Sequence, residues 1–282
     1  MTSIEWTRNP DGSAGASWNY LAGCSVVSPG CTNCYAMRQA ARIARMSPDL
    51  VHYQGLTQPS KAGPVWTGRV FPAGFDKLVE PIRRQKPQTY FVNSMSDLFH
   101  KDVPDDYIVS VARVMTAANW HTYQVLTKRA DRLQNLLKSK LRFAAEQNHI
   151  WWGVSVENRR HGLPRIDLLR QAPAKVRFLS VEPLLEHLGA INLKGINWVI
   201  VGGESGPGAR PMEAAWVRSI RAQCRAADVA FFFKQWGGVR KSTTGRSLDG
   251  RTYSEFPERE QIEPPALDVR REKLERLEAE LV

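Results

Sequence analysis

The chain has 282 residues, of which 43% are hydrophobic and 24% are charged, a composition typical of globular proteins that excludes a disordered chain. No uncharged apolar run approaches the roughly 18 residues of a membrane span, and the first ten residues lack the apolar core of a signal peptide, so we expect a cytoplasmic protein. Lysine and arginine number 39 against 28 acidic residues, and the net charge of +11 favours polyanionic partners such as nucleic acid.

The first predicted element is a strand near residues 18–22, and a cysteine-rich loop follows it directly. Three of the four cysteines lie in this loop in the pattern Cys-x6-Cys-x2-Cys, namely Cys24, Cys31 and Cys34. Such a loop can hold an iron-sulfur cluster through three thiolates and leave one iron open to an exogenous molecule. A structural zinc site needs a fourth protein ligand, for which the distant His100 is a candidate. The pattern favours the cluster over zinc, and unligated thiols are the third interpretation.

A long insertion, residues 36–86, separates the cysteines from the next predicted strand. Its first part, residues 36–46, has helical periodicity and places Arg38, Arg42 and Arg45 on one stripe. The remainder is rich in glycine, proline and aromatic residues. The stripe has two interpretations: a solvated charged face, or a surface that follows a phosphate backbone while the aromatic side chains stack on bases.

From residue 88 onward, short β-branched or aromatic runs alternate with segments of helical periodicity. The predicted strands cover residues 89–92, 122–126, 150–156, 176–181, 198–201 and 230–233, and the predicted helices cover 105–118, 129–137, 162–171 and 213–227. This alternation predicts an α/β fold with a parallel sheet of about seven strands, a full or partial (β/α) barrel of the TIM type. Cys224 follows Trp216 and Ile220 on one face of the last helix, so we expect it to be a small buried hydrophobe.

A polar cluster ends each predicted strand after residue 88. The clusters cover residues 93–97, 127–129, 155–158, 180–183, 202–206 and 234–238. Capping of the following helix explains any single cluster. Because the carboxyl ends of parallel strands meet at one mouth of a barrel, the set predicts a polar pocket there.

The last part of the chain differs in composition from the barrel domain, which we place at residues 1–238. Residues 239–262 combine glycine and serine with several arginines and predict a basic flexible loop, either a flap over the pocket or a connection. Residues 263–282 predict a helix with Leu274, Leu277 and Leu281 on one face. Such a face is typical of a helix that docks on its own chain or on a protein partner.

Several segments together resemble a known family. They are residues 18–24, 28–36, 96–100, 126–129, 153–158, 179–185, 201–208 and 232–237. They are similar to a phage and bacterial family of unassigned function, three-cysteine-motif proteins that resemble radical S-adenosylmethionine (SAM) enzymes, and the resemblance covers about residues 17–238. The cysteine segment is also similar to that of the spore photoproduct lyase branch, in which a DNA lesion is the substrate.

The sequence departs from most radical SAM enzymes in two respects. Their usual spacing is Cys-x3-Cys-x2-Cys with an aromatic residue before the last cysteine, whereas here the first gap is three residues longer, Asn33 takes the aromatic position and Tyr35 follows. The glycine-glycine-glutamate run, which commonly follows the second strand, here follows a late strand as Gly202, Gly203 and Glu204. In that case the run is a candidate for binding substrate or the SAM carboxyl group, and Asn93, Ser94, Ser96 and Asp97 are the candidates for holding the methionine end of SAM.

The resemblance implies a [4Fe-4S] cluster on the three cysteines and a SAM molecule at its open iron. The implied activity is formation of a 5'-deoxyadenosyl radical that modifies or repairs a nucleic acid base or a nucleotide, with an electron donor protein as a further partner. Two alternatives stay open: a non-catalytic nucleic-acid-binding module with a structural metal site, and a radical SAM enzyme that acts on a peptide or a small metabolite.

Residue roles follow from the resemblance and from side-chain chemistry. The catalytic candidates are Cys24, Cys31, Cys34 and Glu204. The cofactor-binding candidates are Tyr35, Asn93, Ser94, Ser96, Asp97, Lys128, Glu157, Asn158, Glu182, Gly202 and Gly203. The substrate-binding candidates are Arg38, Arg129, Lys234, Gln235 and Trp236. Carboxylates suit ribose hydroxyls and an ammonium group, lysine and arginine suit a carboxylate or phosphate, and Trp236 either stacks on a base or fills the barrel.

Overall fold

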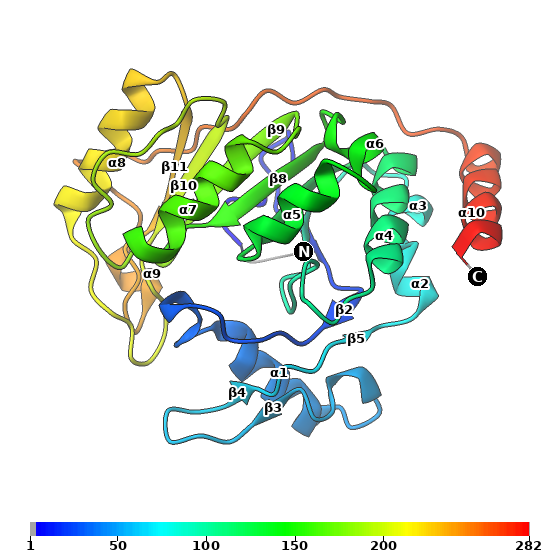
Figure 1. The fold of residues 1–282 in the computed structure, drawn as a ribbon, viewed down its shortest axis with the longest axis horizontal. Helices are drawn as coiled ribbons and strands as arrows, with labels where there is room; N and C mark the ends of the chain where they lie inside the picture. Colours follow the sequence, from blue (N-terminus) through cyan, green and yellow to red (C-terminus); the bar gives the residue numbers. More distant parts are fainter. Residues whose placement is uncertain (1–3, 282) are drawn as a thin grey trace.

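The structure, a computed structural model, describes residues 4–281 and is built around one seven-stranded sheet (Figure 1). In spatial order, which is also chain order, the strands are β1 (Ala16–Trp18), β6 (Thr89–Val92), β7 (Thr122–Thr127), β8 (Ile150–Ser155), β9 (Val176–Val181), β10 (Trp198–Gly202) and β11 (Ala230–Gln235). Every neighbouring pair is parallel. The predicted parallel α/β architecture is confirmed, and the sheet is a curled half-barrel with β1 and β11 at its edges.

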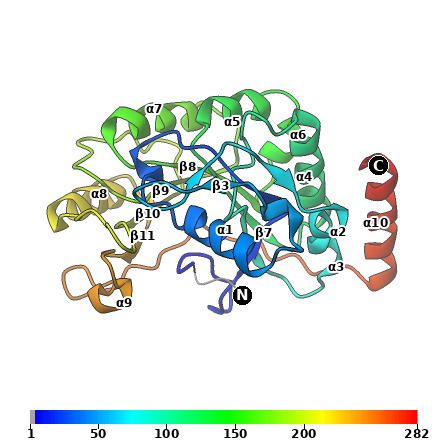
Figure 2. The same ribbon diagram turned by 90° about the horizontal axis from the view of Figure 1, so that it is seen from below.

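Helices between the strands cover the outer face of the sheet, as crossovers between parallel strands require (Figures 1 and 2). They are α4 (Asp105–Ala117), α5 (Ala130–Leu137), α6 (Arg142–Ala145), α7 (Arg159–Arg170) and α8 (Ala214–Ala226). Helix α7 begins three residues before its predicted start, because the Asn158 side chain accepts a hydrogen bond from His161 N and caps the helix. Cys224 is fully buried on α8, as predicted.

Aromatic side chains fill the concave face of the half-barrel. Successive residues of a strand point to opposite faces, so Phe91, Trp151, Phe178, Trp198 and Phe232 turn inward while their neighbours pack under the helices. Trp6 of the N-terminal segment joins this inner cluster and contacts three of its rings. These aromatic side chains fill the half-barrel along the length of its strands, whereas polar residues gather at the carboxyl ends of the strands.

The insertion after the cysteines forms a layer of its own beside the sheet (Figure 1). It contains α1 (Tyr35–Met46), the turn η2 (Val51–Tyr53) and a short ladder of β3 (Thr57–Gln58) and β4 (Val65–Trp66). β5 (Phe71–Pro72) then pairs with β2 (Leu21–Ala22), which precedes the cysteine loop, and the short helices α2 (Phe75–Leu78) and α3 (Glu80–Arg83) lead back to the sheet.

The chain after β11 returns along the sheet. Residues 239–262, for which the composition predicts a flexible loop, contain the short helix α9 (Lys241–Thr244) and a stretch that pairs with β11 through Phe233 N to Tyr253 O and Glu255 N to Phe231 O. Helix α10 (Leu267–Leu281) then packs on α3 and α4, and Leu277 is 5% exposed. Leu274 and Leu277 of its apolar face therefore contact its own chain. No helix among residues 4–281 is both long and apolar enough to span a membrane.

Candidate functional site

A cavity of about 270 Å³ opens at the carboxyl end of the sheet, beneath the cysteine loop. It is lined by the ends of β6, β7, β8, β9 and β11, by the loop after β10 and by the cysteine loop itself. Most of the predicted site residues line it: Cys24, Cys31, Cys34, Tyr35, Asn93, Ser94, Ser96, Asp97, Lys128, Arg129, Glu182, Gly203, Glu204, Lys234 and Gln235. The structure thus brings together residues that are as much as 211 positions apart in the chain, from Cys24 to Gln235.

The cysteine loop is fastened to the sheet at its first residue. Gly23 N donates to Met95 O, and Ser96 Oγ donates to Gly23 O. Gly23 has a φ of +96°, and a Cβ there would lie 2.1 Å from the carbonyl oxygen of Arg69. A glycine is therefore required where the chain passes from β2 into the loop.

The three thiols are free, and their surroundings differ. Cys31 is on the short helix η1 (Pro29–Cys31), and Cys34 precedes the first residue of α1. Burial raises the pKa of the Cys34 thiol, while hydrogen bonds from the backbone of Ala36 and Met37 oppose the increase. Burial and the Asp97 carboxylate raise the pKa of Cys24 to about 12, against an opposing effect of Arg129. The Cys24 and Cys34 thiols are thus protonated at neutral pH, and metal binding to them releases protons.

The thiols of Cys24, Cys31 and Cys34 form the donor set that a metal group could use in this cavity. Within residues 4–281, no three His, Cys, Asp or Glu side chains converge on a point that suits one metal ion. The ring nitrogens of His100 contact Ser25 Oγ and the backbone N–H of Asp102. In a cuboidal cluster each thiolate binds a different iron. Three thiols on the wall of one cavity match that arrangement.

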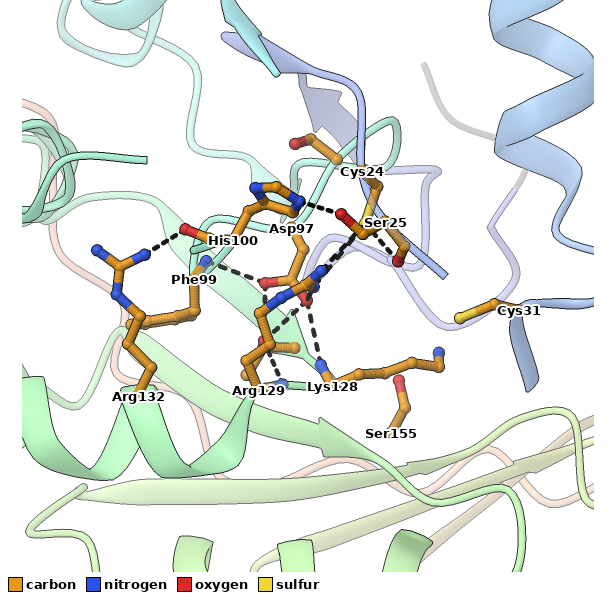
Figure 3. A network of polar contacts seen from close by, with 12 residues as sticks. Cys24, Ser25, Cys31, Asp97, Phe99, His100, Lys128, Arg129, Arg132 and Ser155 are labelled. Atoms are coloured by element: carbon orange, nitrogen blue, oxygen red, sulfur yellow. Dashed lines mark hydrogen bonds and ion pairs between the residues drawn. The ribbon is translucent and has the colours of Figure 1, made fainter. Parts of the chain in front are cut away.

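Asp97 organises the wall next to Cys24 (Figure 3). Its carboxylate accepts hydrogen bonds from Thr127 Oγ1 at 2.7 and 2.9 Å, from Phe99 N at 2.9 Å and from Lys128 N at 3.2 Å. It also forms an ion pair of 2.7 Å with Arg129, whose guanidinium extends to the Cys24 sulfur. The loops after β6 and β7 are thereby locked together beside the first cysteine.

Glu204 is engaged by residues of the same protein. Its two oxygens accept a bidentate pair from Arg210 at 2.5 and 2.9 Å, and Oε2 also accepts from Asn33 Nδ2 at 2.9 Å. Burial raises the pKa of Glu204, but the hydrogen bonds from Arg210 and Asn33 outweigh burial and leave the pKa below its usual value. Because Asn33 belongs to the cysteine loop, Glu204 ties this loop to the loop after β10.

The two glycines before Glu204 each solve a packing problem. A Cβ at Gly202 would lie 2.4 Å from Glu182 Oε1, and a Cβ at Gly203 would lie 2.1 Å from the backbone oxygen of Trp236. The missing side chain at Gly202 therefore leaves room for the Glu182 carboxylate, and the missing side chain at Gly203 lets the chain after β10 approach the chain after β11. Gly202 itself does not line the cavity, whereas Gly203 does.

A partly buried ion pair lies on the far wall of the cavity. Lys234 Nζ is 2.9 Å from Glu182 Oε1, and Trp6 Nε1 donates to Glu182 Oε2 at 3.1 Å. Burial lowers the pKa of Lys234, but Glu182 and Glu5 outweigh this effect and leave the pKa above its usual value. Lys234 therefore stays charged at neutral pH.

Two lining residues keep polar groups free for a ligand. Within the described residues, Lys128 has no carboxylate partner, whereas Arg129, Lys234 and Arg210 each pair with one. Asn93, with a φ of +59°, is 4% exposed, and neither its Oδ1 nor its Nδ2 has a hydrogen-bond partner. A cation and an amide left in this state are suited to an anionic or polar ligand.

Other predicted site residues have their side chains engaged elsewhere. Glu157 is fully buried in a 2.6 Å ion pair with Arg165, and Asn158 caps α7. Arg38 donates to Pro207 O at 3.0 Å. The Trp236 ring packs on Phe233, and its Nε1 donates to Ser247 O. None of these four side chains lines the cavity.

Sequence reasoning missed several residues of the site. Arg210, which holds Glu204, lies in a loop and belongs to no motif that its spacing would indicate. Trp6 reaches the cavity from the N-terminal segment, for which the sequence predicts no element. Ser155 and Ser180 also line the cavity, and both were inside predicted polar clusters without an assigned role.

Comparisons with known proteins identify the family of this chain and find solved structures of low similarity. A family model with the description Protein of unknown function (DUF5131) matches residues 1–257. Curated proteins give no significant match. Solved structures that match include a spore photoproduct lyase complexed with dinucleoside spore photoproduct (12% identity, TM-score 0.39) and a doubly mutated spore photoproduct lyase with bound AdoMet and dinucleoside spore photoproduct (12% identity, TM-score 0.41). Each match covers 79% of this chain and 64% of the lyase, so the chain spans just under two thirds of the lyase length.

Proposed function

The chain belongs to the family DUF5131, and we propose that it is an iron-sulfur enzyme of the radical SAM type that modifies or repairs a nucleic acid base or a nucleotide. One observation carries the proposal: three free thiols from a single loop line the same cavity at the carboxyl end of a parallel half-barrel. That end of a parallel sheet is where α/β enzymes bind their ligands.

Cys24, Cys31 and Cys34 would hold the [4Fe-4S] cluster, and SAM would bind beside it in the cavity. A cluster held there and reduced by a donor would supply one electron to SAM, which would be cleaved into methionine and a 5'-deoxyadenosyl radical able to abstract hydrogen from a substrate. The protein has to bind and orient the ligands and to exclude water from them.

The cavity walls offer groups for these tasks. The free Lys128 ammonium would neutralise a carboxylate or phosphate, and the unpaired Asn93 amide would exchange hydrogen bonds with a polar ligand. Tyr35, Ser94 and Ser96 add hydroxyl groups on the same wall. Glu182 and Lys234 form the opposite, charged wall, where a base edge or sugar would find both an acceptor and a donor.

The substrate class is inferred from charge. The chain carries a net charge of +11, and Arg42 and Arg45 are exposed on α1, the helix that directly follows Cys34. Cationic side chains beside an active-site opening raise the local concentration of phosphate backbones. A peptide or small-metabolite substrate would leave this charge without a role.

The decisive experiment is anaerobic reconstitution of the full chain with iron and sulfide, followed by SAM and dithionite and an assay for 5'-deoxyadenosine. We expect product from the wild type and a loss of at least about 100-fold in Cys24→Ala, Cys31→Ala and Cys34→Ala, in line with the cost of removing metal ligands and their supports. Cys224→Ala is the matched control, because this cysteine is buried on α8 away from the cavity. No product from a wild-type protein with full iron content would refute the proposal.

One observation favours a second candidate, the binding module with a structural metal site. The three cysteines pack in an apolar cluster with Met37, Tyr53, Leu56 and Trp66 of the insertion, as a metal that fastens this layer would require. A purely structural site predicts that chelation releases the insertion to proteolysis while a loaded protein yields no 5'-deoxyadenosine. The proposed enzyme yields the product.

A further inference from the structure

We propose that Arg129 is a positioning residue that donates N–H···S hydrogen bonds to Cys24 and so raises the reduction potential of the cluster. The inference rests on the proposed function, since it concerns a cluster bound at the cysteine loop. It goes beyond the proposed function because it concerns the reduction potential of that cluster.

The geometry singles out one of the three thiols. Arg129 Nη1 and Nη2 lie 3.8 and 4.0 Å from Cys24 Sγ, so both arms of the guanidinium face the sulfur (Figure 3). By contrast, the contact of Cys31 is with the Ser28 hydroxyl at 3.9 Å, and Cys34 is served by backbone N–H groups at the start of α1. Cys24 alone among the three has a cationic donor at its sulfur within residues 4–281.

The guanidinium is held in this orientation. The Arg129 side chain is 13% exposed and its partner Asp97 is 9% exposed, so the 2.7 Å ion pair is shielded from water. Asp97 is itself fixed by Thr127 and by backbone N–H groups, and Arg129 N donates to Thr127 Oγ1 at 2.9 Å. Because the side chain is already ordered, it loses little conformational entropy when it donates to a thiolate.

The other side of Cys24 is also supported. Ser25, its neighbour in the chain, contacts the His100 ring, and the backbone oxygen of His100 accepts from Arg132 of α5. Arg132 thus holds the backbone at His100, and the His100 ring in turn contacts the hydroxyl of the residue that follows Cys24.

The electrostatic consequence has a definite sign. Reduction adds one electron to the cluster and its thiolates, and donors that point at a ligand sulfur stabilise the more negative state. The low dielectric of a buried site strengthens this effect. Removal of the guanidinium should therefore lower the midpoint potential.

The test is an anaerobic redox titration of the reconstituted full chain, followed by electron paramagnetic resonance, with dithionite supplying one electron per cluster and with neither SAM nor substrate present. We expect the midpoint potential of Arg129→Gln to fall below that of the wild type. Arg129→Lys, which keeps the charge but loses the fork, should lie between them. Arg113→Gln removes an exposed arginine of α4 that pairs with Glu280, and it should leave the potential unchanged.

The outcomes separate the inference from the proposed function. An Arg129→Gln protein with wild-type iron content and an unchanged potential overturns the inference and leaves the enzyme proposal standing. If Arg129→Gln does not bind a cluster, Arg129→Lys is measured in its place, and an unchanged midpoint potential in that variant overturns the inference. A purely structural role of Arg129 would lower the melting temperature or the iron content without moving the potential of the clusters that form. A wild type that binds no cluster refutes the proposed function itself, and the inference with it.

Discussion

Asn33 Nδ2 donates a 2.9 Å hydrogen bond to Glu204 Oε2, and this contact joins the cysteine loop to the loop after β10 across 171 positions of sequence. Asn33 also donates to Gly208 O at 3.0 Å, and Arg210 donates to Pro29 O at 2.8 Å. The two loops are thus joined at several points. Glu204, a catalytic candidate by sequence, thus joins two loops that line the cavity.

The hydrogen bond between Asn33 and Glu204 predicts that a negative charge at position 33 destabilises the protein. Asn33→Asp replaces a donor with a second carboxylate facing Glu204, and we expect it to lower the free energy of unfolding by about 2 kcal/mol, since a hydrogen bond to a charged group is lost and like charges meet. Urea unfolding measures the loss, and hydrogen exchange should speed up in residues 24–34. Asn135→Asp, an exposed change on α5, is the control and should have little effect. Equal hydrogen-exchange rates in the wild type and in Asn33→Asp would contradict a role of the Asn33–Glu204 contact in holding the cysteine loop.

The adjacent glycines should respond differently to alanine. At Gly203 a Cβ meets backbone atoms of Trp236 and Gly237, which cannot move without separating β10 from β11, so Gly203→Ala should cost at least about 3 kcal/mol in urea unfolding. At Gly202 a Cβ meets the end of the Glu182 side chain, which can swing away. Gly202→Ala should therefore cost less than half as much, while it separates Glu182 from Lys234. Similar losses in both variants would show that the carboxylate is as fixed as the backbone.

Acid should destabilise the protein through His121. Its Nδ1 accepts from Gln88 N at 3.0 Å and its Nε2 faces Pro81 O at 2.9 Å, so the buried ring fits only as the neutral Nε2–H form. Burial lowers the pKa of His121 to about 4, against about 6.5 in the unfolded chain. The unfolded state therefore binds the proton first as the pH falls, and stability present above about pH 6.5 is lost between there and about pH 4.

The linked loss amounts to about 3 kcal/mol from this residue. Urea unfolding at several pH values should give a smaller acid-dependent loss for His121→Gln than for the wild type. His187→Gln, at an exposed position, should keep the wild-type slope. A His121→Gln protein with the full wild-type slope would assign the acid sensitivity to other groups.

Nucleic acid binding should depend on the exposed arginines of α1. If Arg42 and Arg45 contact phosphates of a single strand, the double change Arg42→Gln with Arg45→Gln should reduce the slope of log K against log salt by about 1.4. Fluorescence anisotropy with a labelled oligonucleotide measures the slope. The control removes two exposed arginines on other surfaces, Arg225→Gln on α8 with Arg271→Gln on α10, and should leave the slope nearly unchanged. Equal effects of both pairs would indicate diffuse binding to the net charge.

Local patterns were sufficient for the elements of the fold. Strands β6 and β9 have the predicted bounds, and the others agree within a few residues, because buried β-branched and aromatic runs between helical segments have few other solutions. Where a predicted boundary was wrong, a single side chain explains the difference. Asn158 caps α7 and gives it an earlier start than predicted. Asn19 lies between β1 and β2, which were predicted as one strand, and its side chain accepts a hydrogen bond from Ser94 N. Backbone hydrogen bonds from 253–255 to β11 gave the tail an order that its composition did not indicate.

The sequence by itself determined which residues could meet at the mouth of the half-barrel, because parallel strands deliver their carboxyl ends to one edge and the cysteines follow β1 after the short strand β2. Only the tertiary structure decided which of those side chains are free for a ligand and which are consumed by contacts within the chain. Glu204 and Glu182 both follow strands, and both are paired, one with Arg210 and the other with Lys234, whereas Lys128 has no carboxylate partner among residues 4–281. The reason is physical: a buried charge must find a partner, and that partner comes from whichever loop the fold brings within about 3 Å, at a separation that no local pattern records.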